Sequence, residues 1–228
     1  MLNEKHHAFV LCCFYRELTD RFGKRGRQAF IKAAQTYGEQ RGKRMSLRAL
    51  RDGNSLDFDS YFAYGEWQPS IGAYDLEMTA GPGVVDERVT RCPWAETFKE
   101  EDLLDCGMDY CKEIDRAIVR GFSPDLELEL ESTLHRQGSC RFLFKDKRIT
   151  EKTLMGVPNP PRPDAEVVKP FKFHVAHVYF VYAHLVWDVF GIEGRSAVAK
   201  ARRSIKEKFG KKVIETIMLY RKCDFTRI

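Results

Sequence analysis

The fold is decided by residues 110–131, which read YCKEIDRAIVRGFSPDLELELE. Residues 110–120 have apolar side chains at the spacing of an amphipathic helix, and Gly121 stands where a C-terminal cap belongs. From Leu126 to Glu131, leucine alternates with glutamate, which is the period of a strand with one buried face. A helix followed by such a strand predicts an α+β fold, an antiparallel sheet flanked by helices.

Upstream of this stretch, the sequence predicts helices, then strands, then another helix. Residues 6–51 have helical spacing, interrupted by a turn at Gly23. Residues 54–90 predict an antiparallel meander, and the aromatic side chains between residues 58 and 67 count among its β-favouring positions. Residues 93–104 return to helical periodicity.

Downstream, a strand and a connector lead into a helical end. Residues 139–145 predict a second strand after a turn. Five prolines within residues 156–170 favour an extended connector. We therefore divide the chain into an α+β domain of residues 1–155, this connector, and a C-terminal helical extension of residues 171–228.

The C-terminal extension echoes residues 6–41. Residues 20–33 read DRFGKRGRQAFIKA and residues 188–201 read DVFGIEGRSAVAKA, so eight of fourteen positions are identical. At the same offset, His6 matches His174. This similarity favours a duplicated helical hairpin whose copies pack with pseudo-twofold symmetry. Two unrelated hairpins with similar turn residues are the alternative.

Composition and charge limit the classes of function. The net charge is only +5, and basic clusters such as residues 41–51 are interpreted as solvated helix faces, so no nucleic-acid partner is expected. The longest apolar run, near residues 175–186, is interrupted by histidines, so no membrane partner is expected either. The N-terminus lacks the pattern of a signal peptide, and seven cysteines, an odd number, are expected to stay reduced. The expected compartment is the cytoplasm.

Cys111 and Asp115 are the first candidates for chemistry. They lie four residues apart on a predicted helix and share its buried face with Ile114 and Ile118. A buried carboxylate is costly unless it is paired or used. Beside a thiol it could accept a proton, orient a substrate nitrogen or join a metal site. A core cysteine next to a structural salt bridge is the alternative.

Two other cysteines and a group of histidines are further candidates. Cys92 and Cys140 bracket the helix at strand boundaries, where a thiol can be activated, although cysteines also serve simply as packing residues. The cysteine spacings match no standard zinc module. His174 and His177 lie among aromatic side chains, where they could line a ligand cavity, bind a metal or belong to a core or interface. The aromatic helix and the repeated hairpins leave a homodimer as a possible assembly.

Short motifs spread over residues 5–145 carry a resemblance to a known family. They are Cys92-Pro-Trp-Ala95, Asp109-Tyr-Cys-Lys-Glu-Ile-Asp115, Gly121-Phe-Ser-Pro124, Thr133-Leu134 and Gly138-Ser-Cys-Arg-Phe142, with Tyr37-Gly38 and Gly42 upstream. In order and spacing they resemble the L-2-amino-thiazoline-4-carboxylic acid hydrolases, although Ser139 stands where that family more usually has aspartate. The succession of helix and strands is also similar to vinyl-reductase-type ligand-binding domains.

The resemblance implies a hydrolase that opens a small carboxylate-bearing heterocycle, a cyclic amidine or thiazoline, at a carbon–nitrogen bond. It implies that Cys111 is the nucleophile, that Asp115 is the acid or base, and that Cys140 belongs to the catalytic group. The residues implied to bind the substrate are Cys92, Trp94, Tyr110, Phe122, Arg141, His174 and His177, with Arg195 as a second candidate for the substrate carboxylate.

Two alternatives remain open beside this hydrolase. One is a non-catalytic small-molecule-binding or sensor domain of the vinyl-reductase type. The other is a metal-dependent hydrolase, with ligands from the cysteines, Asp115 or the C-terminal histidines. No cofactor is required by the sequence, and a bound divalent metal is compatible with it.

Overall fold

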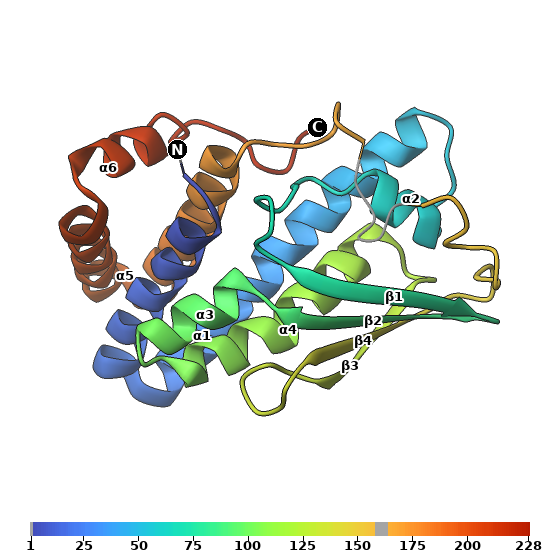
Figure 1. Ribbon diagram of the computed structural model, residues 1–228. Helices are drawn as coiled ribbons and strands as arrows, with labels where there is room; N and C mark the ends of the chain where they lie inside the picture. The colour runs from blue at the N-terminus through green and yellow to red at the C-terminus, as the bar shows by residue number, and fades with distance from the viewer. Residues whose placement is uncertain (1, 158–163) are drawn as a thin grey trace.

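The chain folds into helices packed on a four-stranded sheet (Figure 1). In a computed structural model, residues 2–157 and 164–228 are described. The strands pair antiparallel in the order β1-β2-β4-β3, which confirms the predicted α+β class with helices flanking an antiparallel sheet. The elements are α1 (Glu4–Arg51), α2 (Phe58–Ala63), β1 (Asp75–Gly81), β2 (Val84–Arg91), α3 (Pro93–Glu100), α4 (Leu104–Phe122), β3 (Glu127–Ser132), β4 (Cys140–Lys145), α5 (Phe171–Phe209) and α6 (Lys211–Met218).

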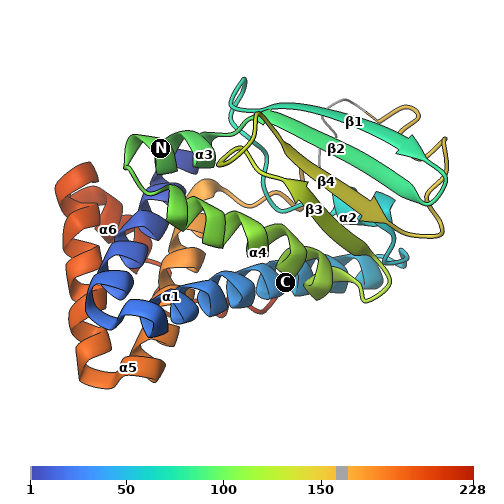
Figure 2. The same ribbon diagram turned by 90° about the horizontal axis from the view of Figure 1, so that it is seen from below.

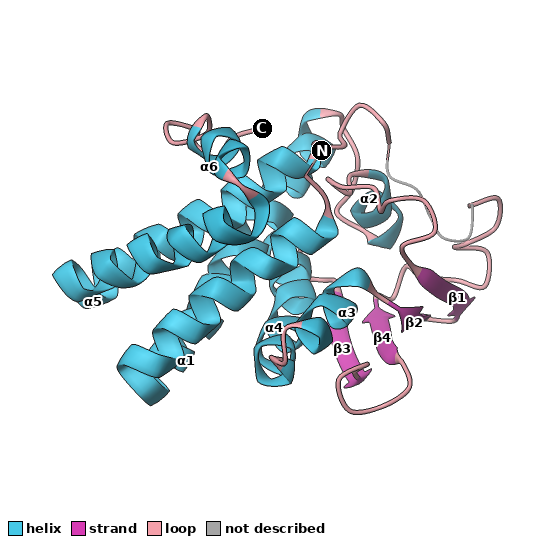
Figure 3. Cartoon of the chain, turned by 60° about the vertical axis from the view of Figure 1, so that its left-hand side comes forward, coloured by secondary structure: helices cyan, strands magenta, loops and turns pink. Residues whose placement is uncertain are grey.

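The sheet has one buried face and one exposed face. Along β4, Cys140, Phe142 and Phe144 are buried, whereas Arg141 and Lys145 are exposed. The glutamates of β3 are exposed as its alternation predicts. Helices α1 and α4 lie on the buried side of the sheet, as Figures 2 and 3 show from two directions, whereas α5 and α6 lie beside α1, away from the sheet. Functional side chains on alternate strand positions can therefore reach the space between sheet and helices.

Helices α1 and α4 approach each other closely beside the sheet. A Cβ atom added to Gly42 would lie 2.0 Å from the carbonyl oxygen of Ile118, and one added to Gly121 would lie 2.4 Å from that of Glu39. Any side chain at either position would therefore push the two backbones apart. This close contact brings the second half of α1 and the C-terminal half of α4 to the same side of the sheet.

The prediction that Gly121 caps a helix was wrong. Helix α4 continues through it to Phe122, and Ser123 is the residue at its end. The glycine is needed for the contact with α1 and not for a left-handed turn. Sequence alone does not separate these two uses of a glycine near a helix end.

The predicted β-structure between residues 58 and 67 was also wrong. Phe58–Ala63 is the helix α2, and the carboxylate of Asp57 accepts a hydrogen bond from the backbone N–H of Ser60 at its start. The rings of Phe58 and Phe62, four residues apart, both lie near Phe144 of the sheet, at centroid distances of 5.3 and 6.1 Å. The spacing of these aromatic residues is thus that of one helix face packed on the sheet.

The two copies of the repeated segment have the same backbone geometry. Gly23 in α1 has φ and ψ of 52° and −127°, and Gly191 in α5 has 56° and −128°, so each long helix bends sharply there. The rings of Phe22 and Phe190, at matching positions, stack with centroids 3.9 Å apart. Contact between matching positions is what a local twofold axis produces. Residues 158–163 of the predicted connector lie outside the described residues.

Helix α5 is the second layer over α1. By length and composition alone it could cross a membrane, but half of its most apolar 18-residue window is buried in the structure. Its aromatic stretch packs inside the chain; Tyr182, for example, lies against Phe14 and Phe30 of α1. A core helix passes the same composition test as a membrane span.

Candidate active site

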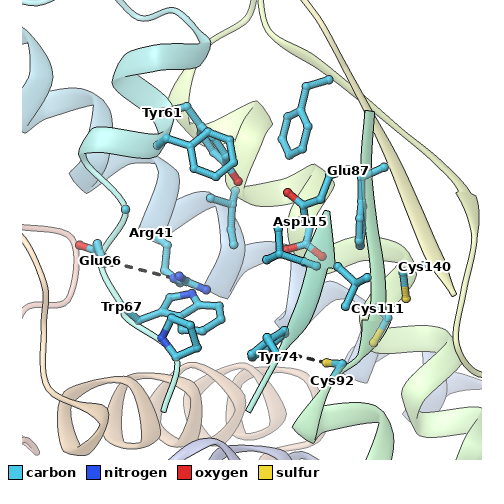
Figure 4. A pocket seen from close by; sticks show the side chains of 18 of the residues that line it. Arg41, Tyr61, Glu66, Trp67, Tyr74, Glu87, Cys92, Cys111, Asp115 and Cys140 are labelled. Atoms are coloured by element: carbon cyan, nitrogen blue, oxygen red, sulfur yellow. Dashed lines mark hydrogen bonds and ion pairs between the residues drawn. The ribbon is translucent and has the colours of Figure 1, made fainter. Parts of the chain in front are cut away.

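A cavity of about 230 Å³ lies between the buried face of the sheet and helices α1, α2 and α4 (Figure 4). Cavities of about 150 Å³ accommodate benzene, so this one suits a single ring with small substituents. Much of its wall is aromatic or apolar. The aromatic lining residues are Tyr61, Phe62, Trp67, Tyr74, Phe142 and Phe144.

Two carboxylates enter the cavity from different elements of the fold. Glu87 projects from β2, where its neighbours across the sheet are Met78 and Phe142, and Asp115 projects from α4. Burial, with the nearby charge of Asp115, raises the pKa of Glu87 to about 8. Burial raises the pKa of Asp115 to about 6, against the opposing influence of Arg41. At neutral pH, the pair therefore holds about one proton.

Arg41 of α1 lies across the cavity from the two carboxylates (Figure 4). Its side chain is 8% exposed, and its Nε is 4.0 Å from a carboxylate oxygen of Glu66, beyond hydrogen-bonding distance. Among the described residues, Nε of Arg41 has no hydrogen-bond partner. A buried guanidinium that lines a cavity and has an unused donor is suited to bind an anion.

The surroundings of Arg41 contain more positive than negative charge. Glu66 is fully buried and makes ion pairs of 2.5 Å with Arg44 and 2.7 Å with Arg48. Burial alone would raise the pKa of Glu66, but hydrogen bonding and charge from Arg44 bring it down to about 2. One carboxylate thus faces three buried guanidinium groups, and an incoming carboxylate would offset part of the remaining positive charge.

Three thiols form a further part of the wall. Cys111 lies on α4, while Cys92 and Cys140 lie at the start of α3 and β4. The sulfur of Cys111 is 3.3 Å from Nε2 of His135, and the Cys92 thiol is 3.6 Å from the hydroxyl of Tyr74. Burial is the largest cause that raises the pKa of each of the three thiols. In the resting protein they are therefore protonated.

Four of the residues expected from the sequence meet at this cavity, namely Cys92, Cys111, Asp115 and Cys140. The expected apolar wall is made by other residues. Trp94, Tyr110 and Phe122 are buried but do not line the cavity. Trp94 instead donates from Nε1 to Nδ1 of His7 at 3.0 Å. These aromatic side chains pack behind the residues that a ligand would touch.

The arginines suggested for a substrate carboxylate lie elsewhere. Arg141 is on the exposed face of the sheet, where it pairs with Asp86 and Glu131, because alternate residues of β4 face opposite ways. Arg195 covers the ring of Trp187 at 3.9 Å, on the exposed part of α5. Neither guanidinium lines the cavity.

The two candidate histidines of α5, His174 and His177, also lie outside the cavity. His174 donates from Nε2 to the carbonyl oxygen of Glu66 at 3.0 Å, and Nε2 of His177 is 2.7 Å from the amide oxygen of Gln40. Burial, with the charge of Arg41, lowers the pKa of His174 to about 3, so its ring is neutral. Through Glu66 and Gln40, both rings adjoin the buried residues Arg41, Arg44 and Arg48, which we call the arginine cluster.

Sequence reasoning missed the two charged residues that define the cavity. Glu87 replaces an apolar residue in the inward alternation of Val85 and Val89, and this interruption is a usable signal. The interpretation of residues 41–51 as a solvated face was wrong at Arg41, Arg44 and Arg48, which are buried. Their spacing of three and four residues marks one helix face. Only the tertiary structure shows what that face meets.

A metal centre was one alternative suggested by the cysteines, Asp115 and the histidines. Within residues 2–157 and 164–228, no group of three or more His, Cys, Asp or Glu side chains could hold a metal ion. All seven cysteines are free thiols. The chemistry that these residues can supply themselves is therefore nucleophilic attack, proton transfer and anion binding.

Comparison with known proteins gives one match. Residues 3–144 match the family model described as L-2-amino-thiazoline-4-carboxylic acid hydrolase, and this region contains every residue that lines the cavity. No curated protein and no solved structure matches the chain, so the similarity to vinyl-reductase-type domains stays a prediction. Because the match covers more than half of the sequence, the chain belongs to the L-2-amino-thiazoline-4-carboxylic acid hydrolase family.

Proposed function

We propose that this protein opens a small carboxylate-bearing heterocycle by hydrolysis at the carbon–nitrogen bond of a cyclic amidine. The substrate to test first is L-2-amino-thiazoline-4-carboxylate, the compound in the description of the family. One observation carries the proposal: an arginine with an unused donor and two carboxylates of raised pKa share one ring-sized cavity.

The polarity of the cavity matches such a substrate. Arg41 supplies donors for the ring carboxylate, and its contact with that group is a charge-assisted hydrogen bond. An amidine is cationic when protonated, and the ionised carboxylate of Asp115 supplies the opposite charge. The aromatic wall, including Trp67 and Tyr74, covers the flat faces of the ring. A ligand with both charges satisfies both ends of the cavity at once.

The carboxylate pair also serves the chemistry. A nucleophile adds to the amidine carbon, and the ring nitrogen must gain a proton as its bond to that carbon breaks. Glu87, with the higher pKa, holds a proton at pH 7 and can give it to this nitrogen. Asp115 stays largely ionised and stabilises positive charge on the amidine.

The test is turnover of L-2-amino-thiazoline-4-carboxylate by the purified protein, followed by mass spectrometry. We expect Asp115→Asn and Glu87→Gln to lower kcat by roughly 100-fold or more, the contribution of positioned acid–base groups. Asp105→Asn and Glu77→Gln are matched controls, because these carboxylates are exposed on the same helix and on the neighbouring strand.

The products separate this function from its alternatives. Cleavage at the ring nitrogen releases an amine without a free thiol, whereas release of a thiol would show that the carbon–sulfur bond breaks instead. Tight binding without any product would identify a binding or sensor domain. Unchanged turnover in both carboxylate variants would contradict the site.

A further inference from the structure

His135 is a residue that neither the sequence motifs nor the cavity lining identified. It lies in the turn between β3 and β4, and its Nε2 is 3.3 Å from the sulfur of Cys111. Cys111 lines the cavity, whereas the imidazole does not. The ring therefore stands behind the thiol, on the side away from a bound ligand.

The absence of a side chain at Gly107 of helix α4 leaves room for this imidazole. A Cβ atom added to Gly107 would lie 2.4 Å from Cε1 and 2.8 Å from Nε2 of His135, so the ring rests directly on the glycine backbone. Gly107 is four residues before Cys111, one turn along the same helix face. Phe98 flanks the ring, with centroids 5.9 Å apart. The glycine thus makes the contact between thiol and imidazole sterically feasible.

The protonation states suit a base and its nucleophile. Burial raises the pKa of the Cys111 thiol, and Cys92, Cys140 and Asp115 add to this effect. Burial lowers the pKa of His135, so its ring is neutral. A neutral imidazole accepts from the thiol through Nε2. The cavity therefore disfavours a free thiolate, and attack by sulfur requires a base in contact with it.

The other two thiols of the cavity have no such base. Cys92 lies beside the hydroxyl of Tyr74, and the sulfur of Cys140 accepts from the backbone N–H of Leu134 at 3.3 Å. Neither hydroxyl nor amide accepts a proton readily at neutral pH. Only Cys111, of the three, is hydrogen-bonded to an imidazole in the described part of the chain.

We propose that His135 is the general base that activates Cys111, the residue that the family resemblance implies as nucleophile; this rests on the ring-opening function proposed above. The sulfur bonds to the amidinium carbon while Nε2 takes the thiol proton, and the π electrons move to the ring nitrogen. Glu87 then protonates that nitrogen and its bond to carbon breaks, so the ring opens to an amine that stays tethered through the remaining ring atoms. The carbon remains on Cys111 as a thioimidate cation.

Water completes the reaction. It adds to the thioimidate carbon and gives one proton to the Glu87 carboxylate, which restores the acid. The adduct expels the Cys111 sulfur, which recovers its proton from the imidazolium of His135, and the bond to the substrate's own sulfur stays intact. The last hydroxyl proton leaves with the product amine. The enzyme returns to its starting protonation state, and water is the only other reactant.

Alkylation with iodoacetamide, resolved by peptide mass spectrometry, tests the pair without a substrate. We expect Cys111 to react faster than Cys92 and Cys140, and His135→Phe to slow it by about tenfold or more, since thiolate formation loses its base. Gly107→Ala should have the same effect by displacing the ring. The matched controls are Gly138→Ala, where an added Cβ meets nothing within 4 Å, and His184→Phe on the exposed surface.

A second measurement uses the substrate. Acid quenching during turnover should trap a mass addition on the peptide of Cys111, and Cys111→Ala should abolish both this addition and turnover. Equal alkylation of Cys111 in the parent protein and His135→Phe, or turnover retained by Cys111→Ala, would overturn the inference while the hydrolase function stands. If the heterocycle is not turned over at all, the proposed function fails, and the alkylation rates still decide whether His135 activates Cys111.

Discussion

Glu87 on β2 and Asp115 on α4 project into one cavity from the sheet and from the helix layer, and the charge of Asp115 adds to burial in raising the pKa of Glu87 to about 8 (Figure 4). Two interacting carboxyls titrate as a pair and share one proton over the range between their pKa values. The lower of these, at Asp115, is about 6. Several measurable properties depend on this pair.

The pH dependence of kcat/KM should be bell-shaped. Activity should rise as Asp115 ionises near pH 6 and fall as Glu87 loses its proton near pH 8. Glu87→Gln should remove the alkaline limb in whatever activity remains, while Glu77→Gln should keep both limbs. Steady-state rates between pH 5 and pH 10 measure this. A rate that stays level across this range would show that the pair takes no part.

The same pair should make the protein less stable at alkaline pH. The folded-state pKa of Glu87, about 8, is above the value of about 4.3 for an unfolded glutamate. Its contribution to stability is therefore complete below that lower value and is lost as the pH rises through 8. Glu87→Gln should raise Tm at pH 9, by about 2–4 °C for each kcal/mol gained, and change it little at pH 5. Calorimetry at both pH values tests this; an equal shift at both would contradict it.

Arg41 should determine affinity for the substrate carboxylate. Removing a charged hydrogen-bond partner costs about 1.5–3 kcal/mol, so Arg41→Gln should raise KM by roughly 10- to 100-fold. The same variant should not alter the kinetics of 2-amino-thiazoline, which lacks the carboxylate. Arg141→Gln, on the exposed face of the sheet, is the control. Equal effects on both compounds would show that Arg41 acts on folding and not on the carboxylate.

Glu66 should hold the arginine cluster together. Its carboxylate is fully buried and contacts Arg44 and Arg48, so Glu66→Gln leaves buried guanidinium groups unpaired. We expect a loss of about 3–5 kcal/mol in the free energy of unfolding, measured with urea. Glu129→Gln breaks an exposed pair with Lys145 and should cost at most about 1 kcal/mol. Similar losses in the two variants would refute the role of the cluster.

The two bends of the repeat should be equally sensitive to a side chain. Gly23→Ala and Gly191→Ala force alanine into nearly the same backbone conformation with positive φ, and each should cost about 1–3 kcal/mol. An added Cβ at either position has open space around it, so the cost is conformational. Gly138→Ala, which lacks a positive φ, should be neutral. Clearly different losses at the two bends would argue against equivalent hairpins.

The best-founded expectations about the cavity came from residues whose spacing in the sequence fixes their relative position. Cys111 and Asp115 are one turn apart on a helix, so their shared face follows from helix geometry alone. The alternation in β3 likewise requires one buried face. By contrast, the aromatic residues of α2 were assigned to a strand, because aromatic side chains favour strands. Only their packing against Phe144 shows that their spacing is that of a helix face. Local periodicity is therefore strong evidence for secondary structure where a segment fits only a helix or only a strand, and weak evidence where it fits both.

The sequence by itself determined the α+β class, the family, the repeated hairpin sequence and the pairing of Cys111 with Asp115, because each follows from short-range periodicity or from motif order. Only the tertiary structure brought Arg41, Glu87 and His135 to that pair, from α1, β2 and a turn after β3. Their approach depends on contacts between distant segments, such as the glycine contacts of α1 with α4 and the space above Gly107. A charged residue on one element carries no local sign of which distant group it will face, so the Cys111–Asp115 pair could be found by spacing and its partners could not.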